Sequence, residues 1–412
     1  MKIFESEALM QNWLSKRFAK GESLSEMITN YDEFKENACK KTGHIITDKL
    51  YDTYLYCLES FVINEVITEN QDISLDPKDR LCPDFLVYAP ETQSVIIIEL
   101  KNIQGPTRQA GTEIGAYAAE VRTYLPFIAE GDVINVIISN EWPTLLRHYA
   151  FNEIFWLQKK LICLEPVRAD DIVQLRIVDL HASFRPSIQP SISSQQLGGY
   201  QLCLYDEELY RGGDYNRTAA YETQMRIALQ AMANRGNALK SHGFAFLWRH
   251  CFHVGLAPYN ITIINIAPFQ SLVNLFKDKD FKPNDATMQF INVLREHDPE
   301  GHGYALEDIK NYGQKFIEDF CSPRTEGFDR WENLKPAIFD QTDALAFVGW
   351  GIFGEMFFDR LAVELKNGIY DCNSTNPLLA ISLLNEIIIE DHARLDFSAL
   401  GGEEINDDDE LF

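Results

Sequence analysis

Two carboxylates and an amine are spaced in this sequence so that they could act together on a phosphate. The dipeptide Pro83-Asp84 lies fifteen residues before Glu99, which begins the tripeptide Glu99-Leu100-Lys101 at the end of an apolar run. On a β-strand, residues two apart project from the same face, so Glu99 and Lys101 would point together while Leu100 packs on the other side. Asp84 would begin the preceding strand of a hairpin and lie beside them. The spacing therefore predicts a compact charged cluster at one end of a hairpin.

The residue types in this cluster suit a hard divalent cation. Carboxylate oxygens from Asp84 and Glu99 are the ligands that Mg²⁺ or Mn²⁺ prefers, and the Leu100 carbonyl could complete the ligand set. Such a cation would polarise a phosphodiester and lower the pKa of a bound water. Lys101 would position that water or neutralise charge that develops on the phosphate. The cluster predicts metal-dependent phosphodiester hydrolysis, and an ordinary hairpin with a surface ion pair is the alternative.

Sequence context separates this tripeptide from a second Glu-Leu-Lys in the chain. Glu364-Leu365-Lys366 lies in a helical pattern, where residues two apart point in directions roughly 200° apart and cannot share a site. The Glu99 copy instead ends an apolar run and follows the only Pro-Asp dipeptide of the sequence. The first copy is therefore the candidate for chemistry.

Hydrophobic patterns around the cluster predict the elements that would position it. The predicted strands are Asp84–Tyr88, Ser94–Lys101, Val133–Ser139, Leu161–Pro166 and Val173–Leu180. One helix is predicted from about Thr47 to Thr68, before the hairpin, and another from Thr107 to Leu125, after it. This order predicts a mixed α/β sheet covered by helices.

The Pro-Asp, spacer, Glu-Leu-Lys pattern resembles that of the PD-(D/E)xK nuclease superfamily over about residues 45–166. The resemblance implies a restriction-endonuclease-like fold, with a core of one helix, three strands, a helix and a strand. It also implies a Mg²⁺- or Mn²⁺-dependent nuclease, most simply a DNA endonuclease in prokaryotic defence, restriction or repair. Relatives often add an acid from the preceding helix, for which Glu59 is favoured and Glu65 is the alternative. An RNA substrate stays open, as does a subunit that binds nucleic acid or protein without cleavage.

The helix predicted after Lys101 offers candidates for substrate binding. Gln109, Glu113 and Tyr117 are four residues apart, so they share one face of that helix. One branch of the superfamily has Gln and Tyr with three residues between them here, whereas this chain has Glu113 in place of that Tyr. Gln109, Arg108 and Tyr117 are candidates for contact with the substrate, and a solvated polar helix face is the alternative.

Charge and composition limit the partners of the chain. The net charge is −25 over 412 residues, so contact with nucleic acid requires a local basic strip, a partner protein or a second copy of the chain. The eight cysteines form no C-x-x-C pair, which fits a reducing cytoplasm. No apolar stretch reaches the roughly 20 residues that cross a bilayer. We expect a cytoplasmic protein without a membrane span.

Changes in composition along the chain predict five segments. These are an N-terminal helical segment over 1–44, a nuclease-like α/β core over 45–182, a linker rich in Ser, Pro, Gln and Gly over 183–199, a mainly helical accessory domain over 200–402 and an acidic tail over 403–412. The accessory domain includes a helical pattern over Asp343–Leu365 and extended patterns at Gly243–Trp248 and Ile261–Ile266. It would serve specificity, sensing or oligomerisation.

Overall fold

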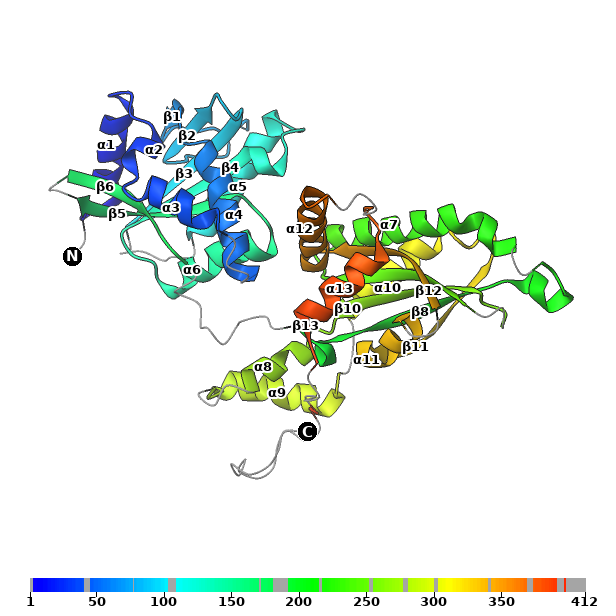
Figure 1. Ribbon diagram of the computed structural model, residues 1–412. Helices are drawn as coiled ribbons and strands as arrows, with labels where there is room; N and C mark the ends of the chain where they lie inside the picture. The colour runs from blue at the N-terminus through cyan, green and yellow to red at the C-terminus, as the bar shows by residue number, and fades with distance from the viewer. Residues whose placement is uncertain are drawn as a thin grey trace. The chain divides into compact units, whose positions relative to one another are not determined.

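The computed structural model divides the chain into two units, Met1–Gln189 and Pro190–Phe412 (Figure 1). The described residues are 3–40, 45–76, 78–102, 109–169, 172–180, 192–214, 217–251, 255–276, 281–299, 303–339, 342–368, 373–390 and 396–397. The division falls inside the predicted linker 183–199, but the predicted linker extends too far toward the C-terminus. Residues 192–199 already form strand β7 (Ile192–Ser193), the short helix η5 (Ser194–Gln196) and the start of strand β8 (Leu197–Tyr205).

A mixed sheet forms the centre of the first unit. Among the described residues it has six strands in the order β1-β2-β3-β4-β5-β6; β3, β4 and β5 run parallel, and the remaining neighbours are antiparallel. The strands are β1 (Glu65–Glu69), β2 (Phe85–Ala89), β3 (Ser94–Lys101), β4 (Val133–Ser139), β5 (Leu161–Ala169) and β6 (Ile172–Ile177). The predicted mixed α/β sheet is confirmed.

Helices cover the buried strands of this sheet. They are α1 (Glu7–Phe18), α2 (Leu24–Met27), α3 (Tyr31–Ala38), α4 (Ile45–Glu59), α5 (Gln109–Tyr124) and α6 (Thr144–Phe151), with the π-helical turn η2 (Asn152–Trp156) after α6. On β3, Ile98 and Leu100 join one apolar core with Leu14 of α1, whereas Ile97 packs in a second cluster with Val121 of α5. The N-terminal segment 1–44 is therefore part of this unit rather than a separate domain.

The helix predicted over Thr47–Thr68 is wrong in its second half. Helix α4 ends at Glu59, and the chain turns before Glu65–Glu69 form β1 against β2. The side-chain amide of Asn64 stabilises this turn, since it donates to the Ser60 carbonyl at 2.9 Å. Apolar residues at 61, 62 and 66 fit helical spacing as well as strand spacing, so pairing with β2 decides the outcome.

The second unit is organised around an antiparallel sheet, which the prediction of a mainly helical domain missed. Its described strands follow the order β11-β8-β10-β9-β12. They are β8, β9 (Gly243–His250), β10 (Tyr259–Ile266), β11 (Ser322–Arg330) and β12 (Thr342–Trp350). The chain order β8, α7 (Glu222–Ala238), β9, β10, α10 (Gly303–Gln314), β11, with two further α-helices of the described chain inserted between β10 and α10, is that of a split β-α-β unit. Strand β12 extends the sheet at the β9 edge. The extended patterns predicted at Gly243–Trp248 and Ile261–Ile266 lie in β9 and β10.

Helices lie along this second sheet, and apolar side chains fill both of its faces. The helices that pack on the sheet are α7 (Glu222–Ala238), α10 (Gly303–Gln314), α11 (Trp331–Phe339), α12 (Ile352–Lys366) and α13 (Pro377–Ile387). Helices α8 (Val273–Phe276) and α9 (Asp285–His297) contribute Val273 and Leu294 to a separate small cluster with Phe397. A short strand β13 (Ile388–Ile389) pairs with β7. Met232 of α7 and Ile309 of α10 share a core with one face of the sheet. Phe244 on β9 contacts Trp331 and Phe353, both at 5.1 Å between ring centroids.

The helix predicted over Asp343–Leu365 is divided into strand β12 and helix α12. Gly351 joins them with a φ of +58°, which favours glycine, and a Cβ there would lie 2.1 Å from Nδ1 of His242. A Cβ at Gly349 would lie 2.8 Å from the backbone nitrogen of Gly354, so the strand and the helix approach closely. The second Glu-Leu-Lys, Glu364–Lys366, is helical as predicted.

Two further predictions are an acidic tail and the lack of a membrane span. The predicted acidic tail, 403–412, lies outside the described residues. Across the ranges that the structure describes, we find no helix with the length and apolar character needed to cross a bilayer.

Candidate active site

The β2–β3 hairpin brings Asp84 and Glu99 together. Phe85 pairs with Ile98 in the antiparallel register, so one further step places Asp84 opposite Glu99. The Asp84 carboxylate turns toward the end of β3, where its Oδ2 accepts a hydrogen bond from the Leu100 N–H at 2.7 Å. The structure therefore places the Pro-Asp acid beside the Glu-Leu-Lys tripeptide, as the spacing predicted.

Glu99 and Lys101 project from the face of β3 that α5 covers. Ile97, two residues earlier on the same face, packs in a small apolar cluster with Tyr117 of α5. Beyond this cluster the Lys101 Nζ lies 2.6 Å from Oε1 of Glu99 and 2.8 Å from Oε2 of Glu113. Leu100 packs into the core on the opposite face. The alternation predicted for the strand thus holds, and α5 adds Glu113 to the cluster.

Burial gives the two acids unusual protonation behaviour. Glu99 is only 4% exposed, and its Oε2 has no hydrogen-bond partner among the described residues. Burial, and then the neighbouring Asp84 charge, raise the pKa of Glu99 well above the ordinary carboxyl range. Burial also raises the pKa of Asp84, although the Leu100 N–H and the Lys101 charge act in the other direction. Both acids are therefore harder to ionise than an ordinary carboxyl group.

The oxygen atoms around this pair fit a hard divalent cation. Oε2 of Glu99 is available for a ligand, and Asp84 uses only one oxygen for the Leu100 N–H. The N–H and C=O of one strand residue point to the same side, so the Leu100 carbonyl also faces the Asp84 side of β3. Within the described ranges, no group of three or more His, Cys, Asp or Glu side chains is arranged to hold a metal ion. A cation here would take two carboxylates, with backbone, substrate or water oxygens as further ligands.

The two acids predicted to join the site from the preceding helix do not do so. Glu59, at the end of α4, has its side chain 60% exposed and forms an ion pair with Lys35 at 2.9 Å. Glu65 begins β1 rather than a helix, and it pairs with Tyr88. Tyr88 lies four residues along β2 from Asp84, a separation of about 13 Å on a strand. The prediction for Glu65 assumed a helix that continues beyond Glu59, whereas Glu59 lies in α4 but forms its ion pair away from the cluster.

Besides Glu113 of α5, a second helix acid near the cluster is Glu7, at the start of α1. Its Oε1 accepts a hydrogen bond from the Asn102 N–H, directly after β3, at 2.9 Å. Its charge also contributes to the raised pKa of Asp84, after burial. The side-chain amides of Asn102 and Asn140 donate to the Phe4 carbonyl at 3.3 and 3.0 Å, which ties the N-terminal segment to the ends of β3 and β4. No local sequence pattern connects Glu7 with the cluster, because 95 positions separate it from Asn102.

The residues predicted to bind substrate have different outcomes. Arg108 and the side chain of Gln109 lie outside the described residues, so these predictions stay open. Tyr117 is buried, and its hydroxyl donates to the Cys82 carbonyl at 3.1 Å. Tyr117 therefore supports the segment that leads to Asp84, and its contact with substrate stays a prediction.

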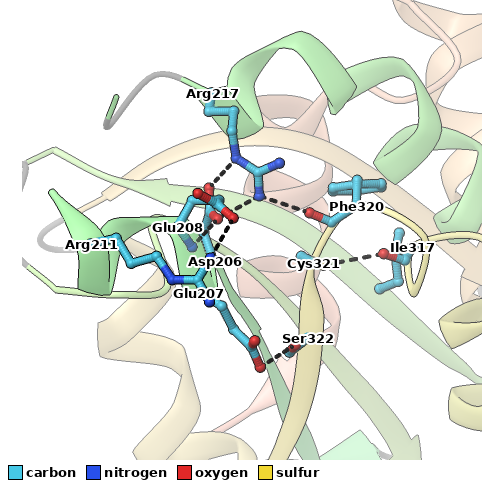
Figure 2. Close-up of polar contacts among 9 residues, drawn as sticks. All are labelled: Asp206, Glu207, Glu208, Arg211, Arg217, Ile317, Phe320, Cys321 and Ser322. Atoms are coloured by element: carbon cyan, nitrogen blue, oxygen red, sulfur yellow. Dashed lines mark hydrogen bonds and ion pairs between the residues drawn. The ribbon is translucent and has the colours of Figure 1, made fainter. Parts of the chain in front are cut away.

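A second buried charge, in the second unit, is closely paired. Asp206 is 1% exposed and forms a bidentate ion pair with Arg217, in which Nε lies 2.9 Å from Oδ2 (Figure 2). Arg217 also donates to the Phe320 carbonyl at 3.1 Å, and Asp206 Oδ1 accepts from the Glu208 N–H at 3.0 Å. This acid caps the short helix η6 (Glu207–Arg211) and ties it to η7 (Arg217–Tyr221). Its contacts are those of a structural ion pair.

Comparison with known proteins adds no relative to this picture: no family model, no curated protein and no solved structure matches the chain. Function must therefore be inferred from the chemistry of the site.

Proposed function

We propose that this protein is a metal-dependent nuclease whose active site is formed by Asp84, Glu99 and Lys101. The observation that supports this most is Glu99 itself. A buried carboxylate in a structural role normally has partners for both oxygens, yet its Oε2 is unpaired within the described structure and lies in a cluster with a second buried acid. Buried acids with strongly perturbed pKa values concentrate at functional sites.

The arrangement of the first unit is consistent with a restriction-endonuclease-like fold. The superfamily core runs helix, three strands, helix, strand, and the described chain order α4-β1-β2-β3-α5-β4 follows the same sequence of elements. The strands form a hairpin-containing sheet whose β3 and β4 are parallel, with α5 as the crossover. This order supports the resemblance noted on Pro83-Asp84 and Glu99-Leu100-Lys101.

Each residue of the cluster has a defined part in the proposed reaction. Asp84 and Glu99, with the Leu100 carbonyl, would hold Mg²⁺ or Mn²⁺. When bound, that cation supplies polarisation of the phosphate and a lowered pKa for water. Lys101 would direct its ammonium at the phosphate oxygens or at the attacking water, where fixed positive charge stabilises the transition state. Glu7 would add negative charge at the rim of the site.

DNA is the substrate that we propose, and the acidity of the chain limits how it binds. A net charge of −25 repels a polyanion at long range. Recognition would therefore depend on local contacts beside the site, on a second copy of the chain or on a partner protein. We place such an endonuclease in prokaryotic defence, restriction or repair, as the resemblance implies.

A cleavage assay tests this proposal directly. The purified full chain is incubated with supercoiled, linear and single-stranded DNA and with RNA, in Mg²⁺, Mn²⁺ or EDTA. We expect cleavage that EDTA abolishes and that Glu99→Ala and Lys101→Ala each reduce about a thousandfold, since a metal site and an aimed cation each supply several kcal/mol of transition-state stabilisation.

The matched control is Lys366→Ala, in the helical copy of the same tripeptide, which should leave cleavage unchanged. Cleavage that survives both site substitutions would exclude this active site, and cleavage in EDTA would exclude the metal. Binding without cleavage of any substrate would favour a subunit that only binds.

A further inference from the structure

Lys101 is shared between carboxylates that come from different elements. Glu99 is its neighbour on β3, and Glu113 reaches it from α5, at 2.6 and 2.8 Å respectively. The environments of the partners differ, because the side chain of Glu99 is 5% exposed whereas that of Glu113 is 34% exposed. Glu113 also lies outside the β2–β3 hairpin, which supplies the proposed metal ligands.

Close contacts fix α5 on both sides of Glu113. A Cβ at Gly111 would lie 2.7 Å from Cε2 of Tyr149, so the absence of a side chain lets α5 approach α6 this closely. Six residues later, the Tyr117 hydroxyl donates to the Cys82 carbonyl at 3.1 Å. The backbone that carries Glu113 is therefore anchored against both α6 and the segment before Asp84.

A cation at Asp84 and Glu99 would change the balance between the partners of Lys101. Positive charge beside Glu99 repels the Lys101 ammonium, whereas Glu113 continues to attract it. We propose that Glu113 is a positioning residue that holds Lys101 in its reactive place when the metal is bound. This inference rests on the proposed nuclease function, and it assigns to Glu113 the place of an anchor rather than of a metal ligand.

A double-mutant cycle on cleavage tests whether Glu113 acts through Lys101. The variants of the full chain are Glu113→Gln, Lys101→Met and their combination, assayed on supercoiled DNA with Mg²⁺. We expect Glu113→Gln to lower kcat about tenfold with KM changed less than about twofold, and to have no further effect in the Lys101→Met background. The control, Glu120→Gln, changes another α5 acid, which accepts a hydrogen bond from the Leu75 N–H, and should leave kcat unchanged.

A second cycle measures the same coupling without cleavage. The thermal unfolding midpoints of the same variants are compared in EDTA and in saturating Mn²⁺. In each condition, the shift in midpoint of the double variant is compared with the sum of the shifts of the two single variants. We expect the difference between them to be larger in Mn²⁺ than in EDTA by about 2 °C or more, because Glu113 is then the main anchor of the ammonium. Calorimetric titration with Mn²⁺ should show that Glu113→Gln still binds the metal, whereas Glu99→Gln does not.

Several results would overturn the inference. In the cleavage cycle, these results are an unchanged kcat in Glu113→Gln, or an equal loss of kcat from Glu113→Gln in the wild-type and Lys101→Met backgrounds. In the thermal cycle, the contrary result is a coupling between Lys101 and Glu113 that Mn²⁺ does not increase. In the calorimetric titration, it is loss of Mn²⁺ binding in Glu113→Gln. If the wild-type chain cleaves no substrate, the nuclease proposal fails, and the thermal cycle still decides whether Glu113 holds Lys101 beside a bound metal.

Discussion

Two buried acids, one in each unit, differ in how their charges are compensated. Asp206 is 1% exposed and accepts hydrogen bonds from Nε and Nη2 of Arg217, while its Oδ1 also caps η6. Glu99 is 4% exposed and has Lys101 on one oxygen, and its other oxygen has no hydrogen-bond partner in the part of the chain described. The charged partner of Asp206 is a cation, whereas Glu99 lies beside two further acids, Asp84 and Glu113, as well as Lys101.

This difference separates a structural ion pair from a buried acid whose charge is only partly compensated. A buried charge that is fully bonded stabilises one local conformation, and its removal leaves the partner charge uncompensated. A buried acid beside a second acid raises the free energy of the folded chain until a proton or a cation compensates it. The comparison therefore predicts opposite stability effects when the two acids are neutralised.

The largest expected effect on stability comes from the paired acid. Asp206→Ala should lower the free energy of unfolding by about 2–3 kcal/mol, because it leaves Arg217 without its carboxylate and the Glu208 N–H without its cap. Urea unfolding measures this change. The control Asp308→Ala breaks the more exposed pair with Arg235 and should cost less than about 1 kcal/mol. Equal effects of the two substitutions would contradict the structural role assigned to Asp206.

The next prediction concerns the rim of the active site. Glu7→Gln keeps an acceptor for the Asn102 N–H but removes the charge, and it should lower Mg²⁺-dependent cleavage about tenfold, as the loss of a group near a metal site typically does. Glu59→Gln and Glu65→Gln should leave cleavage unchanged, because those residues lie elsewhere. Steady-state kinetics on the three variants show which of these acids affects cleavage. A loss of cleavage confined to Glu59→Gln would support Glu59, rather than Glu7, as the additional acid of the site.

The smallest expected effect is a gain of stability at the active site. The pKa of Glu99 is raised in the folded chain above its unfolded value of about 4.3. The folded state therefore binds more protons, and its stability falls as pH rises from that value toward the raised pKa. In EDTA, Glu99→Gln should be more stable than the wild type at pH 8, by about 1 kcal/mol, and should lose this pH dependence. Thermal unfolding of both proteins between pH 5 and 8 measures the gain in stability and its pH dependence. If Glu99→Gln is less stable than the wild type, Glu99 has a structural role.

Local patterns predicted the first unit better than the second. The strands around Asp84 and Glu99 follow from short apolar runs and turn residues, and the structure has them within a few residues. The second sheet escaped prediction because the patterns of its two edge strands do not identify them as strands. β11 (Ser322–Arg330) is a polar edge strand with an irregular register between Thr325 and Phe328, and β12 has an apolar pattern that also fits a helix. For β11 and for β12, pairing with strands that are distant in sequence decides that the segment forms a strand.

The sequence by itself determined which side chains share a face of β3. Alternation along a strand is a local property of the backbone, so Glu99 and Lys101 had to project together while Leu100 entered the core. Only the tertiary structure decided which other acids join them. Glu7 and Glu113 reach the cluster through α1 and α5, whose packing on the sheet depends on contacts between residues far apart in sequence. The same packing removes Glu99 from water, and this burial raises its pKa, a property that no local pattern can encode.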